Sequence, residues 1–162
     1  MDLFQPCEVT PVKRRSILAL GALAAMTRVL PVAAQSVVMI GGPMAGSVFF
    51  TRDDPGLWAS EVDRHLPEIK TEAAPGSTTS VSIRTPHPMD GFKHYILKHK
   101  LLDGRFRLLS QKTFNPERDQ PLSRHVLPAG YRGPVYAVSI CNLHDTWIKG
   151  VMIEGDGPSL AR

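Results

Sequence analysis

The sequence predicts an all-β fold, an antiparallel β-sandwich, from three observations. Several short segments alternate between polar and apolar residues with a period of two, as strands with one buried face do. Proline and glycine cluster between these segments, and hardly any stretch repeats its apolar residues at helical spacing. The 162 residues are 43% hydrophobic and 21% charged, a balance typical of a globular chain that buries one core.

The first two predicted strands are segments 79–84 and 95–101. Segment 79–84 alternates with period two. In segment 95–101, the alternation places Tyr95, Leu97 and Leu101 on one face, opposite two lysines.

The remaining predicted strands lie in the second half of the chain. An Asp-Gly pair at 103–104 is a strong hairpin signal and precedes the alternating segment 105–108. Segment 135–140 is β-branched and apolar, which is consistent with a strand buried on both faces. Segment 147–153 forms the last strand.

Residues 1–34 have the pattern of an export signal. Arg14 and Arg15 precede the apolar run 17–26, which is half the ~20 residues that a membrane-spanning helix needs. Small residues before Gln35 fit a cleavage site. The arginine pair resembles a twin-arginine signal, which exports folded bacterial proteins, so we expect a periplasmic protein without a stable membrane anchor after cleavage. The alternative is an uncleaved N-terminal anchor helix.

This pattern divides the chain into a signal peptide at 1–34, a linker at 35–56 with one edge strand, and a sandwich domain at 57–162. Without residues 1–34 the net charge falls from +4 to about +2. Nucleic-acid binding needs a clustered basic face, so we expect no nucleic-acid partner. A mildly positive surface would still attract small anions.

The chain has two cysteines, Cys7 and Cys141. Cys7 belongs to the predicted signal peptide, so the mature protein would keep one cysteine and no internal disulfide. A lone thiol in an exported protein suggests a reactive group or a metal ligand.

The candidate site residues are histidines in predicted turns or at strand edges, together with this cysteine. Cys141 and His144 are three residues apart, so one tight turn can direct both at a common ion. Four imidazoles and one thiolate exceed a closed tetrahedral zinc site and suit iron with one open position. A zinc or copper site is the alternative. The candidate metal ligands are His65, His87, His94, Cys141 and His144.

At these residues the chain resembles the superoxide reductases, the desulfoferrodoxin and neelaredoxin family. The strongest match is the motif Cys-Asn-x-His-x-x-Trp at 141–147. His87-Pro88-Met89 followed by His94-Tyr95-Ile96 resembles a second motif of the family, and Arg64-His65-x-Pro67 resembles a third. The resemblance extends from about Glu61 to about Ile153.

The resemblance implies an immunoglobulin-like sandwich with one mononuclear non-haem iron. It makes His65, His87, His94 and His144 the equatorial ligands and Cys141 the axial one. The implied reaction is the one-electron reduction of superoxide to hydrogen peroxide, in which Cys141 is catalytic through its thiolate. Arg64 replaces the lysine of the family and would attract superoxide as a second catalytic residue. No Cys-x-x-Cys occurs, so the electron is expected from a separate donor protein.

The chain departs from the family pattern at three points. His87 and His94 are seven residues apart, where the family has six. Asp63 stands where the family commonly has a glutamate that binds the oxidised iron. Asp145 stands where a glycine is usual, and aspartate tolerates a positive φ better than most residues.

Several alternatives stay open. His99 and His125 are interpreted as structural or solvated histidines. The same site is also consistent with a non-catalytic iron-binding or electron-transfer module. The sequence names neither the donor nor the oligomeric state, and a homo-oligomer is among the options.

Overall fold

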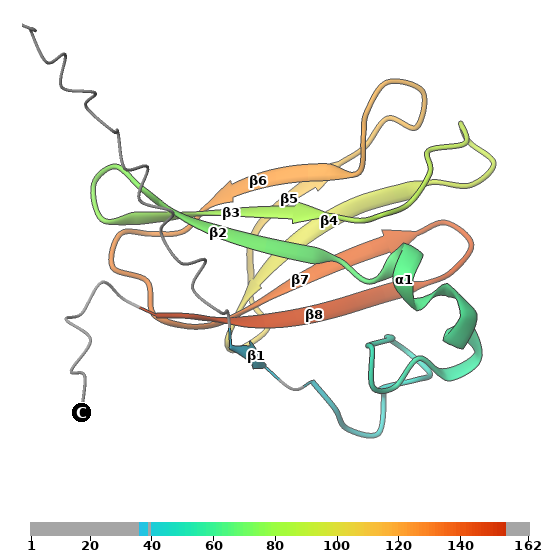
Figure 1. Ribbon diagram of the computed structural model, residues 1–162, viewed down its shortest axis with the longest axis horizontal. Helices are drawn as coiled ribbons and strands as arrows, with labels where there is room; N and C mark the ends of the chain where they lie inside the picture. The colour runs from blue at the N-terminus through green and yellow to red at the C-terminus, as the bar shows by residue number, and fades with distance from the viewer. Residues whose placement is uncertain (1–35, 39, 155–162) are drawn as a thin grey trace, which may run out of the picture. The chain divides into compact units, whose positions relative to one another are not determined.

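The computed structural model describes residues 36–38 and 40–154, which form two antiparallel β-sheets packed face to face (Figure 1). One sheet has five strands in the order β1-β8-β7-β4-β5, and the other has three in the order β2-β3-β6. A 3₁₀ helix η1 and a short helix α1 precede β2. The elements are β1 (Val37–Val38), η1 (Gly56–Glu61), α1 (Val62–His65), β2 (Glu68–Ala74), β3 (Thr78–Arg84), β4 (Ile96–Asp103), β5 (Leu108–Thr113), β6 (Leu122–Val126), β7 (Gly133–Cys141) and β8 (Thr146–Ile153).

The all-β sandwich predicted from the sequence is confirmed, because every pair of strands is antiparallel and the helices are short. Its core lies between the sheets. Val81 and Ile83 of β3 pack there with Leu101 of β4 and Val135 of β7, all of them fully buried. Burial of such side chains, about 1.5–3 kcal/mol each, is the main contribution that holds the sheets together.

Four of the predicted strands correspond to β3, β4, β7 and β8. The strand predicted at 105–108 begins too early, because residues 105–107 belong to the turn and β5 begins at Leu108. The carboxylate of Asp103 accepts hydrogen bonds from the amides of Arg105 and Arg107, at 2.8 and 2.9 Å, and stabilises that turn. Strands β2 and β6 were not predicted.

The face predicted for segment 95–101 is correct only for Leu101. Strand β4 has a register shift between Ile96 and Lys98 against β7. Such an irregularity changes which side chains face the core. Ile96, His99 and Leu101 are therefore the fully buried residues of this strand.

The segment predicted as a linker contributes to the sandwich where the structure describes it. β1 pairs with β8 and supplies the expected edge strand. Phe50, which is 1% exposed, packs against Trp147 with ring centroids 5.7 Å apart. The domain boundaries, and the signal peptide at 1–34 that lies outside the described residues, stay predictions. Among the described residues, no helix is long and apolar enough to span a membrane.

Candidate metal centre

Two connections and one helix end meet at one end of the sandwich, where β3 and β7 end and β4 and β8 begin (Figure 1). His65 is the last residue of α1. His87 and His94 lie in the connection from β3 to β4, and Cys141 ends β7 just before the turn that carries His144. Elements far apart in the chain thus bring all five predicted ligands together.

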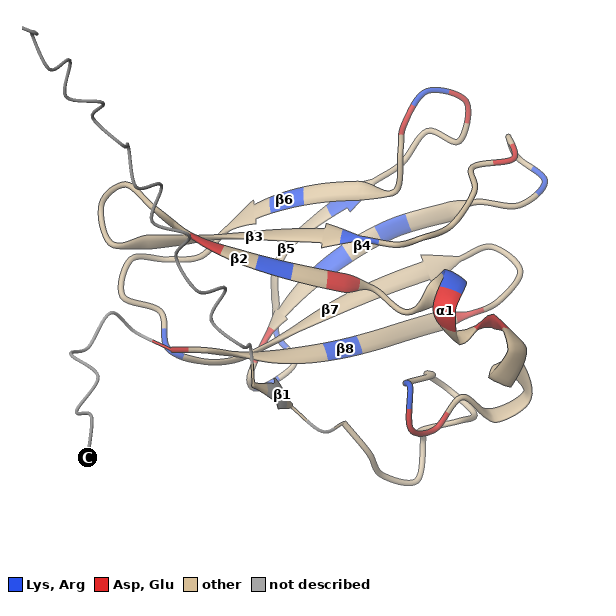
Figure 2. Cartoon of the chain, in the orientation of Figure 1, with Lys and Arg blue, Asp and Glu red and all other residues tan. Residues whose placement is uncertain are grey.

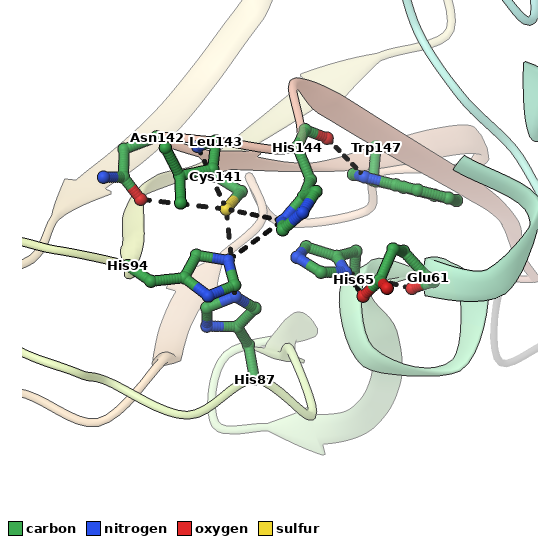
Figure 3. Close-up of polar contacts among 9 residues, drawn as sticks. All are labelled: Glu61, His65, His87, His94, Cys141, Asn142, Leu143, His144 and Trp147. Atoms are coloured by element: carbon green, nitrogen blue, oxygen red, sulfur yellow. Dashed lines mark hydrogen bonds and ion pairs between the residues drawn. The ribbon is translucent and has the colours of Figure 1, made fainter. Parts of the chain in front are cut away.

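The five side chains form a compact cluster (Figure 3). One ligand atom from each residue lies within 4.8 Å of all the others. His65, His87 and Cys141 are buried, while His94 and His144 are half-buried. The cluster is therefore enclosed by protein on one side and reachable from the other.

The atoms that face one another are ring nitrogens and the sulfur. Nε2 of His94 lies 2.9 Å from Nε2 of His87 and 2.9 Å from Nδ1 of His144. The sulfur of Cys141 lies 3.8 Å from Nε2 of His87 and 3.7 Å from Nδ1 of His144. An imidazole nitrogen carries either one proton or one lone pair, so Nε2 of His94 can satisfy only one of its two neighbours.

His65 shows most clearly that the ring nitrogens of the cluster lack hydrogen-bond partners. Its Nδ1 lies 3.0 Å from the carbonyl oxygen of Glu61, which can only accept, so Nδ1 must carry the proton. Nε2 then has a bare lone pair, and this buried atom has no hydrogen-bond partner. A buried polar atom without a partner costs roughly 1–3 kcal/mol. A metal ion bound among these atoms would remove that cost.

The donor set fits a transition metal. Four imidazole nitrogens and one sulfur are donors of borderline and soft character. Burial lowers the pKa of His65, His87 and His94, and the neighbouring histidines lower it further; for His87 the pKa falls to about 4. These three rings are therefore neutral at pH 7, with lone pairs available. Burial raises the pKa of the Cys141 thiol, and nearby backbone amides partly oppose that rise. A bound cation would favour the thiolate.

Hydrogen bonds around the cluster fix the orientation of its members. Nε1–H of Trp147 donates to the carbonyl oxygen of His144 at 2.8 Å. The Asn142 side chain accepts from the amide of Tyr95 at 2.8 Å and donates to the carbonyl of Lys93 at 3.0 Å. Asn142 thus holds the backbone on both sides of His94.

Two of the departures noted in the sequence have structural outcomes. Asp145 adopts φ of 60°, the left-handed conformation expected at a position where glycine is usual. Asp63 lies outside the cluster: its side chain is 89% exposed and lies 3.4 Å from a guanidinium nitrogen of Arg52.

The carboxylate beside the cluster is Glu61, which sequence reasoning missed. Its Oε2 lies 3.6 Å from Nδ1 of His65. Glu61 precedes His65 by four residues, the spacing that places two side chains on one helical face. Arg64 is exposed on α1, where a basic and an acidic residue are adjacent (Figure 2). Its positive charge is among the causes that lower the pKa of His94.

Comparisons with known proteins agree with this geometry. A family model described as desulfoferrodoxin matches residues 58–150. A solved structure of superoxide reductase (neelaredoxin) from Ignicoccus hospitalis is 27% identical, with a TM-score of 0.55, and the match covers 67% of this chain and 96% of that chain. A variant of the same protein is 26% identical with a TM-score of 0.58, covering 72% and 98%. The comparison with curated proteins finds no match.

Proposed function

The chain belongs to the desulfoferrodoxin family, and from this premise we propose that it is a superoxide reductase with one non-haem iron. Each superoxide takes up one electron and two protons and is released as hydrogen peroxide. The observation that carries the proposal is the meeting of four ring nitrogens and one sulfur within 4.8 Å at one end of the sandwich.

We propose His65, His87, His94, Cys141 and His144 as the iron ligands. Iron held by these residues would supply the electron that superoxide accepts. Cys141, as a thiolate, adds negative charge to the centre and favours release of that electron. The amide of Leu143, 3.4 Å from the sulfur, directs a positive dipole at this charge and steadies it.

Arg64 attracts the substrate. Its exposed positive charge is among the causes that lower the pKa of the half-buried His94, so it would draw a small anion toward that side of the cluster. An arginine stays protonated in proteins, so it supplies charge and no proton. The two protons of the product come from water, which reaches the site through its half-buried side.

The electron comes from a separate donor protein. The described residues contain a single group of side chains able to hold a metal ion, so they offer no second centre to relay electrons. That donor would replace the electron used in each turnover.

The test is metal analysis and superoxide consumption by the purified full-length chain. The wild type should hold one iron per chain, show a visible thiolate-to-iron band, and form one hydrogen peroxide per superoxide with an added reductant. Cys141→Ser should lose the band and turnover, while His125→Gln, a change in the core, should keep both. One hydrogen peroxide per two superoxides would indicate dismutation, and a single turnover would indicate a non-catalytic iron module; either result would contradict the proposal.

We also propose export to the periplasm, on the arginine pair and the apolar run at 17–26. Replacing Arg14 and Arg15 by lysine keeps the charge and removes the pair. The substituted protein should stay in the cytoplasmic fraction when cells are separated into compartments. Unchanged export of this variant would exclude the twin-arginine route.

A further inference from the structure

A hydrogen bond outside the cluster joins the two segments that carry His65 and His144. The indole Nε1–H of Trp58 donates to Oδ2 of Asp145 at 2.9 Å, across 87 positions of the chain. The rings of Trp58 and His144 also contact each other edge to face, with centroids 4.7 Å apart and planes at 90°. Trp58 therefore contacts both a proposed ligand and the residue that follows it.

The segment 56–65, which carries Arg64 and His65, is otherwise not hydrogen-bonded to the sheets in the described part of the chain. Its other hydrogen bonds do not reach the sheets. The amide of Trp58 donates to the carbonyl of Pro55, the ring of His65 donates to the carbonyl of Glu61, and the guanidinium of Arg52 in the preceding loop donates to Asp63. Among hydrogen bonds between described residues, Trp58 to Asp145 is the one that connects this segment with the sheets. The segment otherwise rests on apolar contacts, in which Trp58 and Val62 pack against the buried group of Phe50, Leu66 and Trp147.

Asp145 has a left-handed backbone conformation, which favours glycine. Its φ of 60° suits glycine best, and aspartate is among the few residues with a side chain that tolerate this conformation. Glycine would leave the indole of Trp58 without its acceptor. The amide of Cys141 donates to the carbonyl of Asp145 at 2.9 Å, so the same residue also closes the turn between Cys141 and His144.

We propose that Trp58 and Asp145 form a latch that holds segment 56–65 against the metal centre, and that both are positioning residues for His65 and Arg64. The latch retains the metal by keeping the His65 ring in place. This inference rests on the proposed function, because the retained ion is the proposed iron.

The test is the rate at which the iron-loaded, full-length protein releases iron to a chelator. Trp58→Phe keeps an aromatic ring and removes the donor, and Asp145→Gly keeps the left-handed backbone and removes the acceptor. Each change should accelerate release about tenfold, because it removes a hydrogen bond to a charged group. The double variant should release iron no faster than the faster single variant, since both changes break the same bond. Asp145→Asn keeps an acceptor oxygen and tolerates positive φ, so its release should stay within about threefold of wild type.

Hydrogen–deuterium exchange of the amides in 56–65 gives a second readout, which should rise in both single variants and stay low in Asp145→Asn. Asp63→Asn is the matched control, because it removes an exposed acid from the same segment and should change neither measurement. Single variants without effect, effects that multiply in the double variant, or Asp145→Asn as fast as Asp145→Gly would each overturn the latch. If the wild type binds no iron, the proposed function fails, and the exchange measurement decides the latch alone.

Discussion

The six histidines of the chain fall into two groups that differ in what their ring nitrogens face. Four of them form the metal centre, where nitrogens face one another and a sulfur. The other two, His99 and His125, lie between the sheets, where both nitrogens of each ring face hydroxyl groups at 2.8–2.9 Å. The hydroxyls of this second group, the core network, belong to Ser139, Thr85, Ser123 and Ser110.

The difference identifies which histidines are available to a ligand. A hydroxyl can donate or accept, so it satisfies a neutral imidazole whichever nitrogen carries the proton. Ser123 lies between His99 and His125 and has one proton to donate, which couples the tautomers of the two rings. In the metal centre the described partners of the rings are a carbonyl oxygen, other ring nitrogens and a sulfur, and Nε2 of His65 has no partner. The interpretation of His99 and His125 as structural is consistent with their full sets of partners.

The largest expected effect is a loss of iron affinity when a histidine of the metal centre is removed. His94→Ala removes a nitrogen from the centre of the cluster, where it lies 2.9 Å from two others. We expect iron affinity to fall by more than about 100-fold, beyond the 10–100-fold typical for losing a residue behind a ligand. Isothermal titration or metal analysis after dialysis measures this. Unchanged iron content would show that the longer His87–His94 loop does not supply a ligand.

A substitution in the core network should have the opposite pattern: a loss of stability with no loss of iron. His99→Ala removes one buried hydrogen bond from Thr85 and one from Ser123, which keep Ser139 and His125 as their remaining partners, and it opens a cavity. The free energy of unfolding should therefore fall by about 3 kcal/mol. Iron content should stay at one per chain. Urea denaturation and metal analysis check the two halves of this prediction, with His99→Gln as the control that restores part of the hydrogen bonding. Loss of iron without loss of stability would break the comparison.

Lowering the pH should reduce the free energy of unfolding through His99 of the core network. Burial, with smaller contributions from His125 and Lys112, lowers the pKa of His99 from 6.5 to about 3. Below pH 6.5 the unfolded chain binds a proton at this residue that the folded chain does not. The contribution of His99 is therefore fully present above pH 6.5 and is lost as pH falls toward 3, at up to about 1.4 kcal/mol per pH unit. Urea titrations between pH 7 and 5 should show a shallower loss for His99→Gln; equal slopes would contradict a neutral, buried ring.

The smallest effect concerns the approach of substrate. Arg64→Ala should reduce the rate of superoxide consumption about three- to tenfold at low ionic strength, and Arg64→Lys much less, because charge and not shape attracts the anion. Added salt should reduce the difference in rate between Arg64→Ala and the wild type, because salt screens the charge of Arg64. Arg124→Ala, an exposed arginine on β6 outside the metal centre, is the matched control. An effect of Arg64→Ala that salt does not change would exclude electrostatic attraction.

Much of the fold was predictable because the order of polar and apolar residues within a segment indicates whether that segment forms a strand. The alternation in 79–84 and the apolar run at 135–140 correspond to β3 and β7. Strand β6 was missed because its core-facing residues, Ser123 and His125, are polar and satisfied by partners on other strands. The face of β4 was misjudged because a register shift against β7 leaves no mark in the residue pattern.

The sequence by itself determined the chemistry of the candidate site: the residue types, their motifs and the left-handed position at Asp145. Only the tertiary structure decided that Glu61 and not Asp63 lies beside His65, and that Trp58 binds Asp145. The physical reason is that a motif records residues adjacent in the chain. A hydrogen bond across 87 positions depends on how a helix and two sheets pack, and that packing is set by the whole buried core.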